Sequence, residues 1–207
     1  LSHVSATLTR LGAADDATWR ARIQADQLAG EVEYRMAQDS RLTARLQRLS
    51  VPQTEVASVE NLLSQPPANV PALDIVVDDF ELRGRRLGKL QVQAVNRALP
   101  ARAGVREWQL ERLALTMPEA QFEASGLWSP LGARRMALDF RLDLADSGAF
   151  LERMGAGQSM RGGKGQLQGQ LSWSGSPLTL DYPSLGGQLR LDIDAGQIGR
   201  ASCRVRV

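Results

Sequence analysis

Few residues of this chain could carry out catalysis. His3 is the only histidine and Cys203 is the only cysteine, and both lie close to the ends of the sequence. A serine or cysteine nucleophile needs a base beside it, most often a histidine. We therefore expect neither a Ser/His/Asp nor a Cys/His catalytic group, and we predict that the protein is not an enzyme.

Two other patterns are typical of ligand sites, and we interpret both as structural. Carboxylates stand close together at 78–79 and at 192–194, but acids paired on the polar face of a strand usually serve solubility. The glycine-rich segment 162–165 resembles a phosphate loop. A phosphate loop runs from a strand into a helix and has Ser or Thr after its lysine, whereas this segment leads into an alternating pattern. We expect a turn there, and we predict no metal and no cofactor.

The composition indicates a folded domain without a nucleic-acid surface. The chain has 207 residues, of which 43% are hydrophobic and 23% are charged, and its net charge is +2. Basic and acidic residues alternate along the sequence instead of forming a basic stripe, so we expect no nucleic-acid partner. A single cysteine excludes an internal disulfide. Neither a signal peptide nor a run of about 18 apolar residues is recognisable.

Alternation of apolar and polar residues dominates the chain and predicts strands. In the clearest example, 136–144, every second residue is a large apolar one and those between are alanine or charged. Successive side chains of a strand point to opposite faces, so such a strand has one apolar and one polar face. The pattern predicts strands over Val4–Leu11, Thr18–Ala25, Gln27–Met36, Ser40–Val51, Leu73–Val77, Phe80–Arg83, Leu87–Val95, Val105–Met117, Ala120–Trp128, Arg134–Leu144, Gln166–Trp173, Ser176–Asp181 and Gln188–Asp194.

The linkers between these strands predict how the strands pair. Most linkers are short and polar, which favours antiparallel neighbours, because parallel neighbours need a longer crossover. The pattern lapses between 52 and 71, where several prolines mark a loop or a seam. One short helix is expected over Asp146–Met154, with Asp146 or Ser147 as its N-cap and Gly155 at its end. The expected fold class is therefore all-β: a long antiparallel meander that forms a curved, twisted sheet or groove, with one short helix.

The apolar faces of these strands need cover, and very little helix is available to provide it. They can close on one another in a sandwich or barrel, as most one-sided antiparallel sheets do. Alternatively, part of the apolar face stays open as a groove that carries lipid acyl chains. An outer-membrane barrel is the weaker option, because only 5% of the residues are aromatic and they do not gather in girdles. The pattern by itself leaves the sandwich and the groove open.

Several segments of the second half resemble YhdP-type AsmA-like proteins. The segments that carry the resemblance are Leu138–Leu144, Asp146–Gly155, Met160–Leu167, Leu171–Pro177 and Leu185–Leu191. The segments 73–90 and 108–128 are similar too, so the resemblance covers about residues 70–197. The order and spacing of these segments make the combination specific. The first 70 residues share with the family only the general alternation of apolar and polar residues.

This resemblance implies a C-terminal half fragment of a large envelope protein of Gram-negative bacteria. It implies a periplasmic segment whose parent is anchored in the inner membrane, and a β-groove that carries phospholipid toward the outer membrane without any catalytic residue. The partners it implies are phospholipid acyl chains, the remainder of the parent chain, and the inner and outer membranes through parts outside this sequence. The alternative is a structural or assembly domain of the cell envelope with a closed core.

Within that interpretation, residues 1–197 form one segment of the groove, with the possible seam at 52–71. Residues 198–207 break the preceding pattern, so we expect them to be a non-native tail, and the start at Leu1 inside an alternating run suggests an internal piece. The expected helix would cover part of the groove. The predicted lining comprises Met136, Leu138, Phe140, Leu142, Leu144, Leu167, Leu171, Trp173, Leu189, Leu191 and Ile193.

Overall fold

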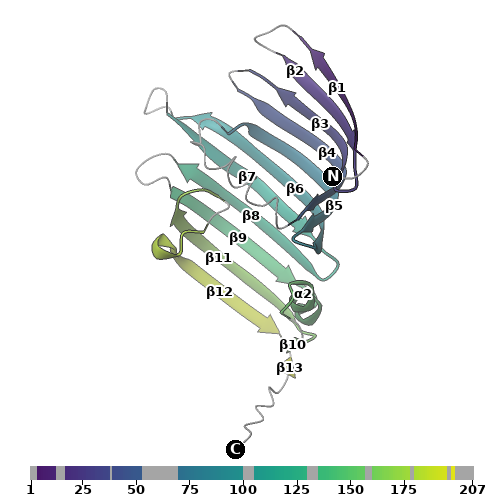
Figure 1. The fold of residues 1–207 in the computed structure, drawn as a ribbon. Coiled ribbons are helices and arrows are strands. Elements are labelled where there is room, and N and C mark those ends of the chain that lie inside the picture. The colour runs from purple at the N-terminus through teal and green to yellow at the C-terminus, as the bar shows by residue number, and fades with distance from the viewer. Residues whose placement is uncertain are drawn as a thin grey trace, which may run out of the picture.

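A single open sheet accounts for most of the fold (Figure 1). The computed structural model describes residues 4–12, 17–37, 39–52, 70–99, 105–129, 135–156, 160–177, 180–194 and 197–198. Within them, 11 strands lie side by side and β1 and β12 form the two edges. In sheet order the strands are β1 Ser5–Leu11, β2 Thr18–Gln24, β3 Leu28–Arg35, β4 Arg41–Val51, β5 Ala72–Leu82, β6 Arg85–Ala98, β7 Arg106–Thr116, β8 Ala120–Ser129, β9 Arg135–Leu144, β11 Lys164–Ser174 and β12 Gly186–Asp194. The expected all-β class and curved sheet are confirmed.

All neighbouring strands of this sheet are antiparallel except one pair. β4 and β5 run parallel, with Ala44 opposite Ile75 and Leu46 opposite Val77. The expected antiparallel meander is therefore wrong at this pair, and the sheet is mixed. The connection 52–71 is long enough for the crossover that a parallel pair requires. The connection 145–163 between β9 and β11 is nearly as long, yet that pair is antiparallel, so length permits the parallel pairing without dictating it. The proline-containing segment thus connects the one pair of neighbouring strands in this sheet that keep the same direction.

Two strand predictions need correction. Leu73–Val77 and Phe80–Arg83 are not separate strands, because β5 continues through both with a register shift between Val77 and Phe80. Such a bulge absorbs extra residues without ending the strand. The described residues of Ser176–Asp181 form no strand, and a 3-10 helix, η3 (Tyr182–Ser184), follows them. Pro177 lies in this segment and has no N–H to donate to a ladder.

A short second sheet and one helix complete the described structure. β10 (Met160–Arg161) pairs with β13 (Gln197–Ile198). Helix α2 (Ser147–Arg153) forms where expected, and Asp146 is its N-cap, accepting a 3.0 Å hydrogen bond from the N–H of Ala149. The expected turn before β11 is also confirmed, because Gly162 and Gly163 both have positive φ, at 61° and 97°.

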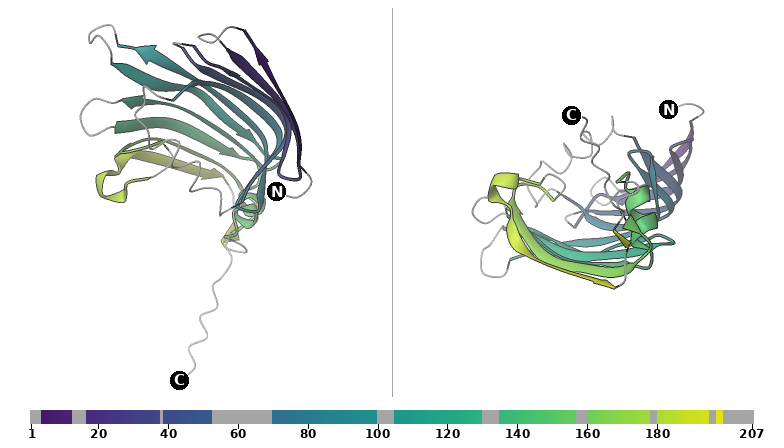
Figure 2. Two further views of the ribbon diagram at one scale, coloured as in Figure 1. Left: turned by 45° about the horizontal axis from the view of Figure 1, so that its top comes forward. Right: turned by 90° about the horizontal axis from the view of Figure 1, so that it is seen from below.

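Strand register places most of the large apolar residues of the sheet on one face. A middle row of residues runs opposite one another from edge to edge of the sheet: Leu8, Ala21, Val32, Ala44, Ile75, Val92, Leu113, Ala124, Phe140, Gly169 and Leu189. The row beside it, toward α2, includes Leu46, Val77, Leu90 and Leu142, and the row on its other side includes Leu42, Ala94 and Leu138. The sheet curves around this face, and α2 lies on its inner side (Figure 2).

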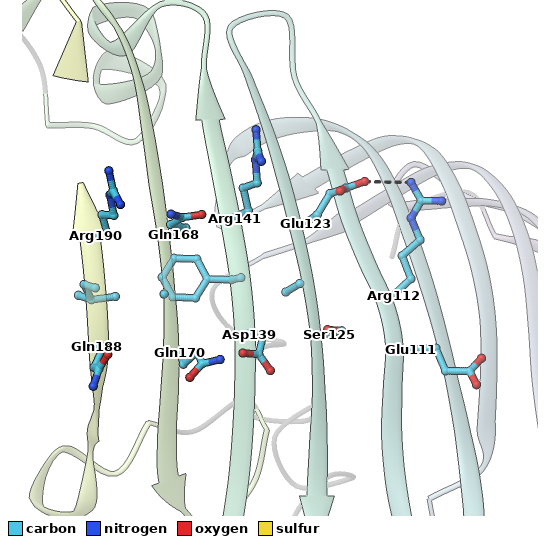
Figure 3. A pocket seen from close by; sticks show the side chains of 14 residues that line it. Glu111, Arg112, Glu123, Ser125, Asp139, Arg141, Gln168, Gln170, Gln188 and Arg190 are labelled. Carbon is cyan, nitrogen blue, oxygen red and sulfur yellow. Dashed lines mark hydrogen bonds and ion pairs between the residues drawn. The ribbon is translucent and has the colours of Figure 1, made fainter. Parts of the chain in front are cut away.

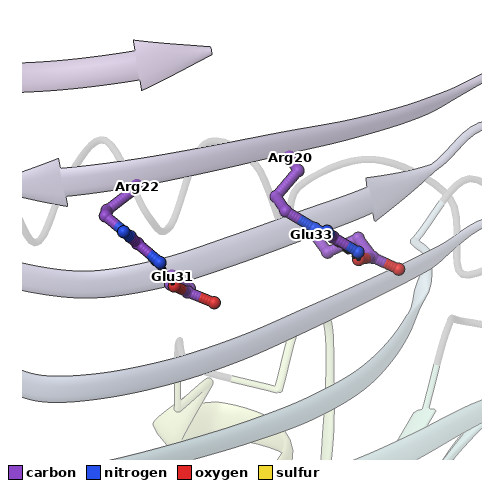
Figure 4. Close-up of polar contacts among 4 residues, drawn as sticks. All are labelled: Arg20, Arg22, Glu31 and Glu33. Carbon is purple, nitrogen blue, oxygen red and sulfur yellow. Dashed lines mark hydrogen bonds and ion pairs between the residues drawn. The ribbon is translucent and has the colours of Figure 1, made fainter. Parts of the chain in front are cut away.

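The outer face of the sheet carries ion pairs between neighbouring strands. On β2 and β3, Arg20 binds Glu33 at 2.8 Å and Arg22 binds Glu31 (Figure 4). Further pairs on this face are Arg45–Asp74 at 2.9 Å, Arg97–Glu111 at 3.0 Å and Arg112–Glu123 at 3.0 Å. Each exposed pair contributes at most about 1 kcal/mol, but together they keep this face wet. The contrast between the two faces fixes the register, because a one-residue slip would exchange them.

Two glycines with similar positive φ allow the cost of a left-handed backbone to be distinguished from the cost of a steric clash. Gly84 and Gly88 have φ of +76° and +74°, and a Cβ at Gly84 would meet nothing within 4 Å, whereas one at Gly88 would lie 2.3 Å from the carbonyl oxygen of Thr116. Gly84→Ala should lower the free energy of unfolding by about 1–2 kcal/mol, the cost of a left-handed alanine. Gly88→Ala should lower it by about 3 kcal/mol or more, because strand β7 must also move. Urea unfolding of both variants measures the difference, and equal losses would contradict the close approach.

Candidate functional site

The inner face of the sheet is apolar and only partly covered. In the middle row, the residues larger than alanine are half-buried or exposed, and of its apolar side chains only the small Ala44 and Ala124 are buried. Two buried hydrophobic clusters meet at this row: one of them includes Ala44 of the row itself, and partly buried Val92 and Leu113 pack against both. The middle row is therefore a partly accessible apolar strip on the inner side of the curved sheet, which we call the groove.

Helix α2 covers one side of the groove, which we call the α2 rim. Phe150 and Met154 of the helix pack against the cluster that contains Leu90. An ion pair holds the helix to the sheet: Arg153 donates to both carboxylate oxygens of Glu119, with Nη2 3.0 Å from Oε2. Arg153 Nη1 also donates to the carbonyl of Arg86 at 2.8 Å. One guanidinium thus joins α2 to two turns of the sheet.

Glu119 is the most enclosed carboxylate of the described ion pairs. Its side chain is only 7% exposed, and its backbone carbonyl accepts the N–H groups of Ala145 and Asp146 at 2.9 and 3.2 Å. The hydrogen bond from Arg153 lowers the pKa of Glu119, although burial acts in the opposite direction. The same bond raises the pKa of Arg153. Both groups are therefore charged at neutral pH.

Three tryptophans form the opposite side of the groove, which we call the tryptophan rim. Trp108, Trp128 and Trp173 are buried in one cluster with Met136. Their indole N–H groups donate to backbone carbonyls of segments beside the sheet: to Pro71 at 3.2 Å, to Gly175 at 2.8 Å and to Ser176 at 2.8 Å. Each indole thus buries its ring and satisfies its one donor, which fixes these segments over the strand ends.

The predicted lining residues all occupy the inner face, but they differ in exposure. Register aligns Phe140 with Gly169 and Leu189, Leu142 with Leu167 and Leu191, and Leu144 with Gly165 and Ile193. Leu138 lies opposite Leu171, and Met136 opposite Trp173. Met136 and Trp173 are buried in the tryptophan rim, and Leu138, Phe140, Leu142, Leu144, Leu167 and Leu171 are half-buried. Leu189, Leu191 and Ile193 of the edge strand are 62, 57 and 43% exposed. That these residues line a lipid path stays a prediction.

The outer face has a depression of a different character. It has a volume of about 760 Å³, and its charged and amide side chains come from outer positions of β7 to β12 (Figure 3). Arg112 and Glu123, which are ion-paired at 3.0 Å, lie at one end, and Gln188 and Arg190 lie at the other. The charged pairs and amides suit water and not an acyl chain. Ala124, Phe140, Gly169 and Leu189 of the middle row also line the depression, so it shares these positions with the groove and differs from it in its surrounding polar side chains.

The described residues meet the requirements of neither a metal site nor a membrane-spanning helix. No group of three or more His, Cys, Asp or Glu residues in them could hold a metal ion. No helix in the same ranges is both long and apolar enough to cross a membrane.

The chain matches one known protein family over almost its whole length. Residues 2–204 match the family described as YhdP protein. The chain belongs to the YhdP family. No curated protein and no solved structure matches it. YhdP proteins are a family of the bacterial envelope and are generally non-enzymatic, and this membership together with the long sheet fits a lipid-transport protein of the AsmA-like type.

The extent of the YhdP match adds to the sequence prediction. The resemblance seen in the sequence covered about residues 70–197, whereas the match begins at residue 2. The groove likewise extends to β1, so its floor includes Leu8, Val32 and Ile75, which the predicted lining omitted. Alternation in the first half was the available signal. The match also reaches residue 204, inside the segment 198–207, and the origin of that segment stays a prediction.

The ion pair between Glu119 and Arg153 should make the free energy of unfolding fall as the pH is lowered. Because the pKa of Glu119 is lowered from its ordinary 4.5 in the folded protein, its contribution is complete above that value and is lost as pH falls through the lowered pKa. Glu119→Gln should cost about 1–3 kcal/mol at pH 7 and remove part of the stability loss expected on acidification from about pH 5 to about pH 3. Thermal unfolding across this range measures both effects.

The matched control for Glu119→Gln is Glu123→Gln, which breaks the exposed pair with Arg112. It should change the free energy of unfolding by less than about 0.5 kcal/mol at pH 7. If the two variants lose equal stability, the enclosed pair does not hold α2 to the sheet.

Proposed function

We propose that this chain is a non-enzymatic, periplasmic segment of a lipid-transport protein anchored in the inner membrane, and that its groove carries phospholipid acyl chains between the inner and outer membranes. The observation that supports this most is the apolar middle row, which crosses every strand of the open sheet and is at least partly accessible except at the buried Ala44 and Ala124. Membership in the YhdP family supports the same proposal.

The energetics of an acyl chain explain why an open apolar row matters. Exposing two chains of about 16 carbons to water costs on the order of 25 kcal/mol, at about 0.8 kcal/mol per CH₂. A carrier needs apolar contact along the whole path, because any wet gap restores part of that cost. The middle row offers such contact from Leu8 to Leu189.

The length of the row also suits an acyl chain. Neighbouring strands lie about 4.8 Å apart, so a row across 11 strands spans about 48 Å. Two opposed acyl chains fill the hydrocarbon core of a bilayer, which is about 30 Å thick, so one chain is about 15 Å long. The groove therefore holds an acyl chain that lies along it, across several strands.

The alternative of a structural domain with a closed core finds less support. A closed sandwich or barrel would bury the middle row, and a barrel would also pair the two edge strands. Instead the sheet is open, β1 and β12 are exposed along their whole lengths, and Leu8 is 63% exposed. The large apolar side chains at both edges favour a path that is accessible along its length.

Photo-crosslinking from adjacent residues tests which face meets lipid. A photoreactive residue replacing Phe140 lies on the inner face, and one replacing Arg141 lies on the outer face of the same strand. With vesicles of phosphatidylethanolamine and phosphatidylglycerol, position 140 should label lipid at least about fivefold more than position 141, because apolar contact is confined to the groove. Mass spectrometry of the adducts measures the ratio. Equal labelling would reject the proposed facing.

A charge in the groove should block lipid without unfolding the protein. Leu189→Glu places a carboxylate on an exposed inner position of the edge strand, and Gln188→Glu places the same group on the outer face beside it. Leu189→Glu should reduce the phospholipid that co-purifies with the chain by more than about fivefold, because a carboxylate against an acyl chain loses its hydration. Gln188→Glu should retain it. Equal retention by both variants would argue against the groove.

A further inference from the structure

The inner positions of the sheet carry charge only at the rims, and that charge is positive. At the strand positions that the structure describes, the inner face has no Asp or Glu. Its charged residues are Arg10 and Arg106 on the tryptophan side and Arg85 on the α2 side. An anionic group that accompanies an apolar ligand would therefore meet cations and no carboxylates along these inner positions.

The two arginines on the tryptophan side already have partners. Arg106 donates to the side chain and backbone carbonyl of Asn96 at 2.9 and 2.8 Å and to Asp39 at 2.6 Å. Arg10 lies over the ring of Trp19, 5.7 Å from its centroid. Both guanidinium groups are thus committed to contacts within the protein.

Arg85 differs from them in having no carboxylate partner within the described part of the chain. It is exposed, and it lies opposite Leu82, whose side chain packs against the cluster beside α2. Its neighbour Arg86 is 3.9 Å from Glu81. Arg83, also exposed, stands two residues earlier in the same turn. The turn between β5 and β6 therefore presents free positive charge at the α2 rim.

The backbone after α2 leaves room for the guanidinium of Arg85. Gly155 follows the helix with a φ of +76°, and a Cβ at this position would lie 2.6 Å from Nη2 of Arg85. Glycine thus allows the guanidinium to rest against the end of the helix, where it stands at the edge of the groove and still meets water. This position suits the boundary between an apolar chain and a hydrated headgroup.

We propose that Arg85 binds the phosphate of a phospholipid whose acyl chains lie in the groove, so that the headgroup lies over the α2 rim. The inference rests on the proposed function and adds the orientation of the lipid across the groove. Guanidinium groups match phosphate oxygens with two parallel hydrogen bonds, which makes arginine well suited to a phosphodiester.

Binding of two lipids with the same acyl chains tests this proposal. Dioleoyl phosphatidylglycerol carries the phosphate and dioleoylglycerol lacks it. Fluorescence competition with the whole chain gives a Kd for each lipid, and inorganic phosphate alone serves as a probe of free anion binding. Arg85→Gln should raise the Kd for phosphatidylglycerol by roughly three- to fivefold, the scale of an exposed ion pair, and leave that for dioleoylglycerol unchanged.

Variants of two other arginines show whether the phosphate contacts Arg85 itself or responds only to the total positive charge of the protein. Arg86→Gln removes the same charge from the outer side of the same turn, and Arg10→Gln removes it from the other rim. Both should bind phosphatidylglycerol as the parent chain does, and Arg85→Lys should restore part of the affinity. Inorganic phosphate should not compete.

Other binding results would contradict either the proposed lipid orientation or the proposed function. Equal losses for Arg85→Gln and Arg86→Gln, or a loss only for Arg10→Gln, would overturn the orientation while the groove stands. Competition by inorganic phosphate at Arg85 would show a free-anion site instead of a headgroup contact. If the parent chain binds neither lipid, the proposed function fails, and the orientation fails with it.

Discussion

The structure depends on the constraint that successive side chains of a strand face opposite ways. Because the strands share the same alternation, hydrogen bonding in register gathers most large apolar residues on one face and the ion pairs between neighbouring strands on the other. Bulges at Val77–Phe80 and Leu110–Leu113 adjust the count of residues without exchanging the faces. A curved sheet with one apolar face must either close or leave that face accessible, and this sheet does not close.

The rims show how the open face is kept stable. At one side, the ion pair between Glu119 and Arg153 attaches a helix of two turns to the strand ends, where propensity alone would not hold it. At the other side, three indole N–H groups attach neighbouring segments of backbone. Burial is thus concentrated along both sides, and the strip between them stays available. This division lets one layer of strands remain folded while it presents an apolar floor.

Much of this arrangement could be predicted from local patterns, and the remainder depends on contacts that are distant in the sequence. Alternation located nearly all strands, and Asp146 and Gly155 correctly bounded the helix. The parallel pairing of β4 with β5 was missed, because alternation specifies faces and not direction. Ser176–Asp181 shows that alternation over a few residues is insufficient when a proline interrupts it. The ion pair of Glu119 could not be predicted from the sequence either, because its partner Arg153 is 34 residues away and only the fold brings the two together.

The order of the strands has a consequence for how such a protein can form and vary. Within the 11-stranded sheet, each strand pairs with the strands before and after it in that sheet's chain order, with longer connections between β4 and β5 and between β9 and β11. Folding can therefore begin at any hairpin and proceed outward, as in repeat proteins whose units contact only their neighbours. Addition or loss of a hairpin would change the number of units and leave the cross-section of the trough unaltered. Evolution can thus adjust the reach of such a molecule by duplication, without redesigning its interior.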